Sequence, residues 1–111
     1  MLDTTKLGYR PLTIEEVQAQ LDQGAEVFIV DVREPRAYYA GHIVDAILLP
    51  ADDFADRFSR ELSPDDPVIL VCEKGLTSVA AAKFLVSQGF TDVSTMEGGM
   101  NAWTGERTVP R

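Results

Sequence analysis

The sequence feature that most constrains the fold is the stretch from Pro67 to Ser78, PVILVCEKGLTS. Its four apolar residues, three of them β-branched, follow a proline and run directly into Cys72, the only cysteine in the chain. A short apolar run of this kind is typical of a strand buried on both faces. Gly75 follows, and Ser78 is expected to be the N-cap of a run of good helix formers. The pattern places Cys72 at the carboxyl end of a central strand, where open α/β sheets bind ligands.

The composition of the chain indicates one globular domain. Its 111 residues are enough for one core, and 45% hydrophobic with 25% charged residues is typical of globular proteins. The net charge of −8 argues against nucleic-acid and membrane partners. No apolar run approaches the roughly 20 residues that span a bilayer. The first ten residues lack the layout of a signal peptide, so we expect a cytoplasmic location.

The chain contains one cysteine and one histidine, which are few soft ligands for a metal. The sequence therefore predicts no zinc or iron–sulfur site, and it implies no organic cofactor. A lone cysteine is most often a small buried hydrophobic residue, so a role for Cys72 has to be argued from its surroundings. An inert Cys72 in an ordinary strand-to-helix turn is the alternative that these residues leave open.

Strand-like and helix-like segments alternate along the chain without an internal repeat. Residues 1–8 are expected to form a flexible N-terminus, residues 9–104 the domain, and residues 105–111 a polar, frayed tail. The alternation predicts an α/β fold with a central parallel sheet of four to five strands and helices on both faces. The predicted strands are 9–12 (an edge strand, because of Pro11), 26–32, 46–49, 68–71 and 91–95. The predicted helices begin at Thr13 (a capping box with Glu16, ended by Gly24), and span 35–40, 51–62, 78–88 and 100–103.

The loop after Cys72 has features that favour a reactive thiolate, which is the nucleophilic form of cysteine. The backbone N–H groups of residues 73–78 can turn inward around the sulfur as an anion-binding nest, and Gly75 helps them to do so. The following helix adds the positive end of its dipole. Lys74 is a candidate cation, whereas Glu73 opposes it if it points inward. The same cradle could hold a second, anionic sulfur on Cys72 or the oxyanion portion of a substrate.

Two other cysteine chemistries are less compatible with this loop. A phosphatase loop needs an arginine at its end to clamp phosphate oxygens, but Thr77 and Ser78 occupy those positions. The loop is also one residue too short to surround a phosphate if the helix begins at Ser78. A Cys–His pair would need His42, whose position relative to Cys72 cannot be read from the sequence. We interpret His42 as a hydrogen-bonded residue of a turn.

Several short motifs between Leu12 and Trp103, weak individually, together resemble those of a single-domain rhodanese, a sulfurtransferase. Their order and spacing are specific for that fold. They are Asp31-Val32-Arg33-Glu34, Gly41-His42-Ile43, the strand Ala46–Pro50, the loop Cys72–Ser78, Gly89-Phe90, and Glu97-Gly98-Gly99-Met100 with Trp103.

The resemblance implies that Cys72 takes a sulfane sulfur from a donor such as thiosulfate, forms a persulfide, and passes the sulfur to cyanide or a thiol. The partners it implies are these small molecules and, as a further candidate, a sulfur-relay protein. The six-residue loop is similar to that of sulfurtransferases, whereas phosphatase relatives have a longer one. A non-catalytic rhodanese-like binding or regulatory module stays open, and so, more distantly, does a phosphatase or arsenate reductase. The substrate-binding residues would be Glu73, Lys74, Gly75, Leu76, Thr77 and Ser78, chiefly through their amides.

Two residues depart from the family pattern. Glu73 stands where these loops often carry a basic residue, and its charge disfavours a dianionic donor. Asp45 stands in a turn where a glycine or another small residue is usual.

Six further residues are interpreted as structural. Asp31 and Arg33 are expected to tie neighbouring loops together by charge-assisted hydrogen bonds. Met100 and Trp103 are expected to cover the core. Gly98 and Gly99 are expected to allow unusual backbone angles near the end of the sheet.

Overall fold

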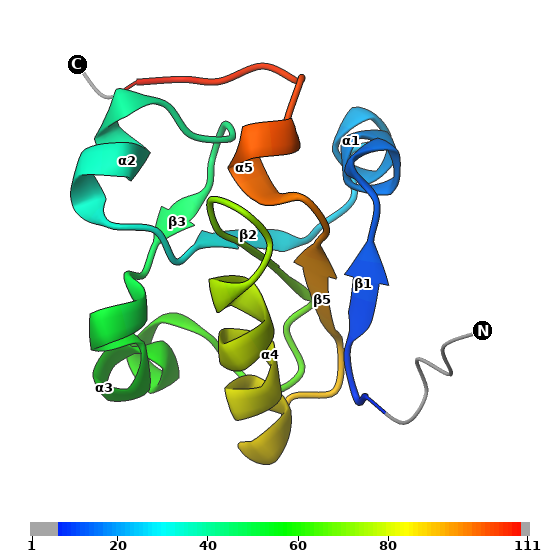
Figure 1. Ribbon diagram of the computed structural model, residues 1–111. Helices are drawn as coiled ribbons and strands as arrows, with labels where there is room; N and C mark the ends of the chain where they lie inside the picture. Colours follow the sequence, from blue (N-terminus) through cyan, green and yellow to red (C-terminus); the bar gives the residue numbers. More distant parts are fainter. Residues whose placement is uncertain (1–6, 110–111) are drawn as a thin grey trace.

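The computed structural model describes residues 7–109, which form a five-stranded parallel sheet with helices on both faces (Figure 1). The strand order is β1-β5-β4-β2-β3, and every neighbouring pair is parallel. The predicted fold class is therefore confirmed. The elements are β1 (Arg10–Leu12), α1 (Ile14–Asp22), β2 (Phe28–Asp31), α2 (Pro35–Ala40), β3 (Ile47–Leu48), α3 (Ala51–Glu61), β4 (Val68–Val71), α4 (Thr77–Ser87), β5 (Val93–Met96) and α5 (Gly99–Ala102).

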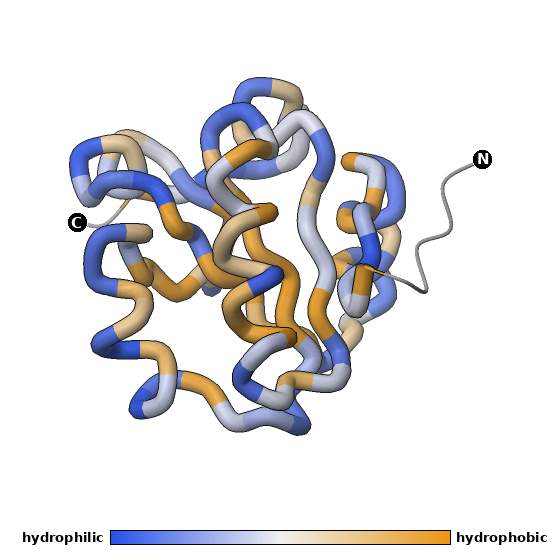
Figure 2. The backbone as a smooth tube through the Cα atoms, turned by 60° about the horizontal axis from the view of Figure 1, so that its bottom comes forward, coloured by the Kyte–Doolittle hydropathy of each residue, from blue (hydrophilic) through white to orange (hydrophobic). Residues whose placement is uncertain are grey.

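The central strand is β4, and all four of its residues are buried. Because successive side chains of a strand point to opposite faces, Leu70 and Cys72 join the core beneath α3 and α4. Ile69 and Val71 join a second core, which contains residues of α1 and α5. Figure 2 shows the same arrangement, with hydrophobic segments in the middle of the molecule and hydrophilic ones at its periphery. Burial on both sides explains the uninterrupted apolar run of this strand.

The start of α1 follows the predicted capping box. The Thr13 hydroxyl accepts a hydrogen bond from the Glu16 N–H at 3.1 Å, and the Glu16 carboxylate accepts one from the Thr13 N–H at 3.0 Å. These two bonds satisfy backbone donors that the helix cannot satisfy itself. They fix the direction in which the chain leaves β1, the strand that lies at the edge of the sheet as predicted.

The strand 68–71 has the predicted limits, whereas the limits of the other four strands differ from the predicted ones by one or two residues at one or both ends. The apolar pattern reports burial, and burial continues beyond the paired backbone. Val32 and Leu49 illustrate this, because both are buried although each lies one residue past the end of its strand.

The start of α4 was predicted incorrectly. The helix begins at Thr77 behind Leu76, and no side chain caps it, so Ser78 is not the N-cap. The reason lies in the loop, where the Ser78 N–H donates to the sulfur of Cys72. The sulfur takes one of the free N–H groups that a cap side chain would otherwise satisfy.

The segment after α5 is tied to the domain. His42 and Thr108 exchange two backbone hydrogen bonds of 3.0 and 2.8 Å. The guanidinium of Arg107 donates to the carbonyl of Met100. The expectation of a frayed tail is therefore wrong for residues 105–109, whereas residues 1–6, 110 and 111 lie outside the described part of the chain. Within residues 7–109, no helix has the length and apolar character needed to cross a membrane.

A matched pair of leucine variants tests the packing of α4. Leu85 is fully buried, whereas Leu76 is 74% exposed. We expect Leu85→Ala to lower the free energy of unfolding by about 3 kcal/mol, because it leaves a cavity under the helix. Leu76→Ala should change it by less than about 0.5 kcal/mol. Urea unfolding followed by Trp103 fluorescence measures both values, and similar losses for the two variants would contradict the assignment of the core face.

Candidate active site

Cys72 lies directly after β4, at the carboxyl edge of the sheet, with only 3% of its surface exposed. The backbone N–H groups of Gly75 and Ser78 both donate to its Sγ at 3.2 Å. The Ser78 hydroxyl oxygen lies 3.4 Å from the same sulfur. The loop therefore surrounds the sulfur with donors, an arrangement that stabilises negative charge there.

The start of α5 holds this loop in place. The Met100 N–H donates to the carbonyl oxygen of Cys72 at 2.8 Å, and the Asn101 N–H donates to that of Glu73 at 2.9 Å. A trans peptide directs its N–H opposite to its carbonyl. These two bonds therefore turn the N–H groups of Glu73 and Lys74 away from α5. In Figure 1, α5 and the loop between β4 and α4 lie side by side. The backbone of α5 thus fixes the start of the cysteine loop and makes no hydrogen bond to the sulfur itself.

Glycines make this close contact feasible. Gly99 has a φ of 62°, and a Cβ there would lie 2.5 Å from the carbonyl oxygens of both Cys72 and Glu73. Gly75 has a φ of 87°, and its Cβ would lie 2.9 Å from the Gly98 nitrogen. Gly98 also has a positive φ, as expected from the sequence. The sequence did not reveal that these glycines face the cysteine loop.

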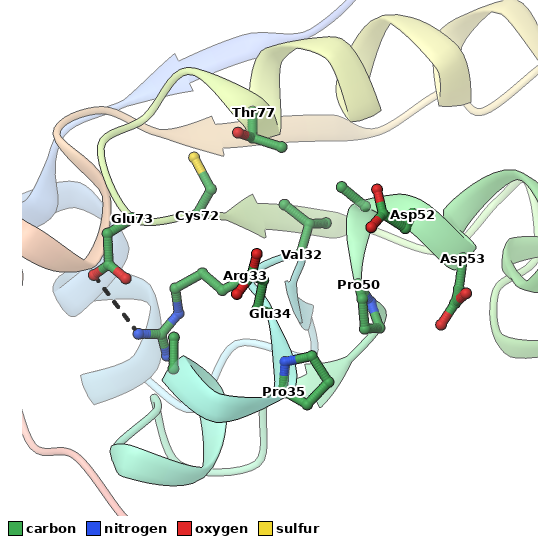
Figure 3. Close-up of a pocket in the computed structure, with 12 residues that line it drawn as sticks. Val32, Arg33, Glu34, Pro35, Pro50, Asp52, Asp53, Cys72, Glu73 and Thr77 are labelled. Atoms are coloured by element: carbon green, nitrogen blue, oxygen red, sulfur yellow. Dashed lines mark ion pairs between the residues drawn. The ribbon is translucent and has the colours of Figure 1, made fainter.

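A pocket of about 600 Å³ opens beside Cys72 (Figure 3). The segments that follow β2, β3 and β4 all contribute to it, because the carboxyl ends of parallel strands meet at one edge. Of the loop residues named from the sequence, Cys72, Glu73 and Thr77 line the pocket. Lys74 and Leu76 are exposed and are not among its lining residues. The full lining is Val32, Arg33, Glu34, Pro35, Ala37, Pro50, Ala51, Asp52, Asp53, Cys72, Glu73 and Thr77.

The cation in the pocket lining is Arg33, not Lys74. Its Nε donates to Asp31 Oδ1 at 2.9 Å, and its Nη2 donates to Asp31 Oδ2 and to the Gly41 carbonyl, both at 2.8 Å. Burial alone would lower the pKa of Arg33, but the hydrogen bonds and charge of Asp31, with smaller effects of Glu73 and Cys72, raise it. The expected structural role of this pair is confirmed, and the additional place of Arg33 in the pocket was missed.

The other charged groups of the pocket are acidic. The Glu73 carboxylate lies 3.8 Å from Arg33 Nη1, and its side chain is 47% exposed. Glu34, Asp52 and Asp53 line the same pocket. A single guanidinium therefore faces four carboxylates, and the charge that opposes a dianionic ligand is larger than Glu73 alone suggested.

His42 lies outside the pocket lining. Its ring stacks on Tyr38 with centroids 3.7 Å apart, and its Nδ1 lies 2.9 Å from the Tyr38 carbonyl oxygen. These contacts agree with the turn role expected for it and leave Cys72 without a histidine partner. Asp45, the departure in the same turn, has a φ of 67°, a conformation that aspartate tolerates better than most residues.

The family of the chain follows from its sequence as well as its fold. Residues 13–106 match the model of the rhodanese-like domain. The chain belongs to the rhodanese-like domain family. It is 41% identical over 95 residues to the thiosulfate sulfurtransferase GlpE of Pseudomonas syringae pv. syringae, covering 86% of this chain and 87% of that protein. It is 39% identical to the protein of the same name from Pseudoalteromonas translucida, over 87% and 90% of the two chains.

The fold is shared with solved structures of the family. A rhodanese-like domain protein from Staphylococcus aureus superimposes with a TM-score of 0.85 and 29% sequence identity. The match covers 92% of this chain and 99% of that one. Both the order of the motifs and the arrangement of the elements therefore agree with the rhodanese family recognised from the sequence.

The contact between Gly99 and the cysteine loop can be tested with two glycine variants. Gly99→Ala should lower the free energy of unfolding by about 3 kcal/mol, because it adds a clash with two carbonyls to the backbone strain. Gly24→Ala is the control, since Gly24 has a φ of 70° but open space around its Cβ position. It should cost only about 1 kcal/mol. Urea unfolding gives both values, and equal losses would show that the loop does not depend on this contact.

Proposed function

We propose that this protein is a thiosulfate sulfurtransferase that carries the transferred sulfur as a persulfide on Cys72. The observation that carries the proposal is the pair of 3.2 Å hydrogen bonds from the Gly75 and Ser78 amides to Sγ, next to a pocket. The names of the two relatives at about 40% identity support the choice of thiosulfate as a donor. The loop also lacks the arginine with which a phosphatase would clamp its substrate.

The reaction requires only nucleophilic displacement at sulfur. The Cys72 thiolate attacks the sulfane sulfur of thiosulfate, the S–S bond of thiosulfate breaks, and sulfite leaves with the bonding electron pair. An acceptor then attacks the outer sulfur of the persulfide, and the Cys72 thiolate leaves. With cyanide the product is thiocyanate, and with a thiol it is a new persulfide. The electrons balance within each step, so no metal or organic cofactor has to take part.

The loop is suited to both states of the sulfur. Its amides and the positive end of the α4 dipole stabilise the free thiolate and afterwards the anionic persulfide. Amide donors do not change their protonation with pH and add no bulk to the pocket. The Ser78 hydroxyl can donate a hydrogen bond to the thiolate, since its oxygen lies 3.4 Å from Sγ. Thr77 lines the pocket on the side of α4 and can contact the donor.

Intact mass spectrometry tests the proposed intermediate. After incubation with thiosulfate, the wild-type chain should gain the mass of one sulfur atom and lose it when cyanide is added. Cys72→Ser is the matched control and should gain nothing, because no other cysteine is available. Failure of the wild-type chain to gain sulfur from any donor tried would rule out the proposed function.

The charges of the pocket predict an unusual dependence on salt. With one guanidinium and four carboxylates in the lining and a net charge of −8, the protein as a whole repels a dianionic donor. Salt screens this repulsion. We expect kcat/KM for thiosulfate, measured at saturating cyanide, to rise about two- to fivefold between about 20 and 200 mM ionic strength. A fall over this range would mean that local attraction outweighs the acidic surroundings.

A further inference from the structure

We infer that Nη1 of Arg33 is the subsite for the anionic end of the sulfur donor, and that Glu73 is a displaceable counter-ion that weakens binding there. This assignment rests on the proposed function, because it concerns the donor of the same Cys72. It names two specificity-determining residues. From the sequence, Arg33 was interpreted as structural, and Glu73 as a substrate-binding residue whose charge disfavours a dianionic donor.

The hydrogen bonds of Arg33 leave one end of its guanidinium available. Its Nε and Nη2 are engaged by Asp31 and by the Gly41 carbonyl. Within residues 7–109, Nη1 has no hydrogen-bond partner, and its one ion-pair contact is Glu73 at 3.8 Å, beyond hydrogen-bonding distance. No buried side-chain nitrogen or oxygen in that part of the chain lacks a partner, so Nη1 is in contact with the open pocket. Nη1 carries two N–H donors that none of the hydrogen bonds of Arg33 uses.

The two partners of the Arg33–Glu73 pair differ in how firmly they are held. The Arg33 side chain is 5% exposed and is fixed by its bonds to Asp31 and Gly41. The Glu73 side chain is 47% exposed and, within the described residues, accepts no hydrogen bond. Because the Glu73 carboxylate is half-exposed and lies beyond hydrogen-bonding distance of Nη1, it can turn away from Arg33 and be solvated by water. An arriving anion can therefore replace Glu73 at Nη1 while Arg33 stays in place.

The location of Arg33 suits a donor that reacts at Cys72. Both residues line one pocket, and Figure 3 shows Glu73 between the guanidinium and the loop that carries the sulfur. The charge of Cys72 is among the causes that raise the pKa of Arg33, which agrees with their proximity. In this assignment a sulfonate oxygen binds at Nη1 and the sulfane sulfur approaches Sγ. The same donor then stabilises the negative charge of the departing sulfite.

Glu73 opposes each of these events. Its carboxylate competes with the sulfonate for Nη1 and repels a dianion that enters the pocket. A donor without a sulfonate, such as a persulfide on another thiol, would lose nothing from this competition. Glu73 therefore biases the enzyme away from small dianionic donors without changing the cradle around Cys72.

Steady-state kinetics of Glu73→Gln test this role of Glu73. The variant removes the charge and keeps the size of the side chain. We expect KM for thiosulfate to fall about three- to tenfold with kcat nearly unchanged, because only binding of the anion improves. Glu61→Gln is the control, since it makes the same charge change at an exposed position at the far end of α3. Its KM should equal that of the wild type.

A binding experiment separates this inference from the proposed function. In a Cys72→Ser background no sulfur is transferred, so titration calorimetry with thiosulfate measures binding alone. Adding Glu73→Gln to that background should tighten binding by the same factor as the fall in KM. If the wild type transfers no sulfur but this tightening is seen, the subsite stands and the proposed function fails. If neither KM nor the dissociation constant responds to Glu73→Gln more than to Glu61→Gln, the inference is wrong. Arg33 variants are less informative, because they leave Asp31 buried without its partner.

Discussion

Two backbone hydrogen bonds from α5 to the carbonyls of Cys72 and Glu73 are the constraint on which the site depends. They hold the first two carbonyls of the loop against α5, and the N–H groups of Gly75 and Ser78, further along the loop, donate to the sulfur. They form only because Gly99 brings the backbone of α5 against the loop, where a Cβ would collide with both carbonyls. A short helix of four residues near the end of the chain therefore holds the start of the loop that follows Cys72.

The buried pair Asp31–Arg33 is the second constraint. Buried ion pairs rarely add net stability, because two charges must leave water, but loss of one partner strands the other at a cost of about 3–5 kcal/mol. Here the pair also joins the end of β2 to the Gly41 carbonyl after α2. The same bonds that make Arg33 a structural residue hold its remaining donors rigidly in the pocket. A structural and a binding role are thus compatible in one side chain.

Much of the architecture could be predicted from the sequence, because it depends on residues that are close together along the chain. The apolar run 68–71, the alternation of elements and the capping box at Thr13 each depend on neighbouring residues, and the structure contains all of them. The side chains around Cys72 could not be assigned in the same way. Lys74 was the sequence candidate for a cation because it is close along the chain. The register of the sheet brings Arg33 to this position instead. Asp31 at the end of β2 pairs with Val71 at the end of β4. Arg33 and Glu73 each follow two residues later, and their side chains meet. Ser78 was misassigned as a cap for a related reason, since the sulfur takes its N–H.

The site divides its electrostatics between backbone and side chains. The amides around Sγ stabilise an anionic sulfur whatever side chains the loop carries, so Glu73 can occupy the position after the cysteine without removing the cradle. The side chains of the pocket act on the donor instead, because they lie where the rest of the molecule must enter. A single charge change at Glu73 or at the acidic residues of α3 can therefore alter which donor binds while the nucleophile keeps its surroundings.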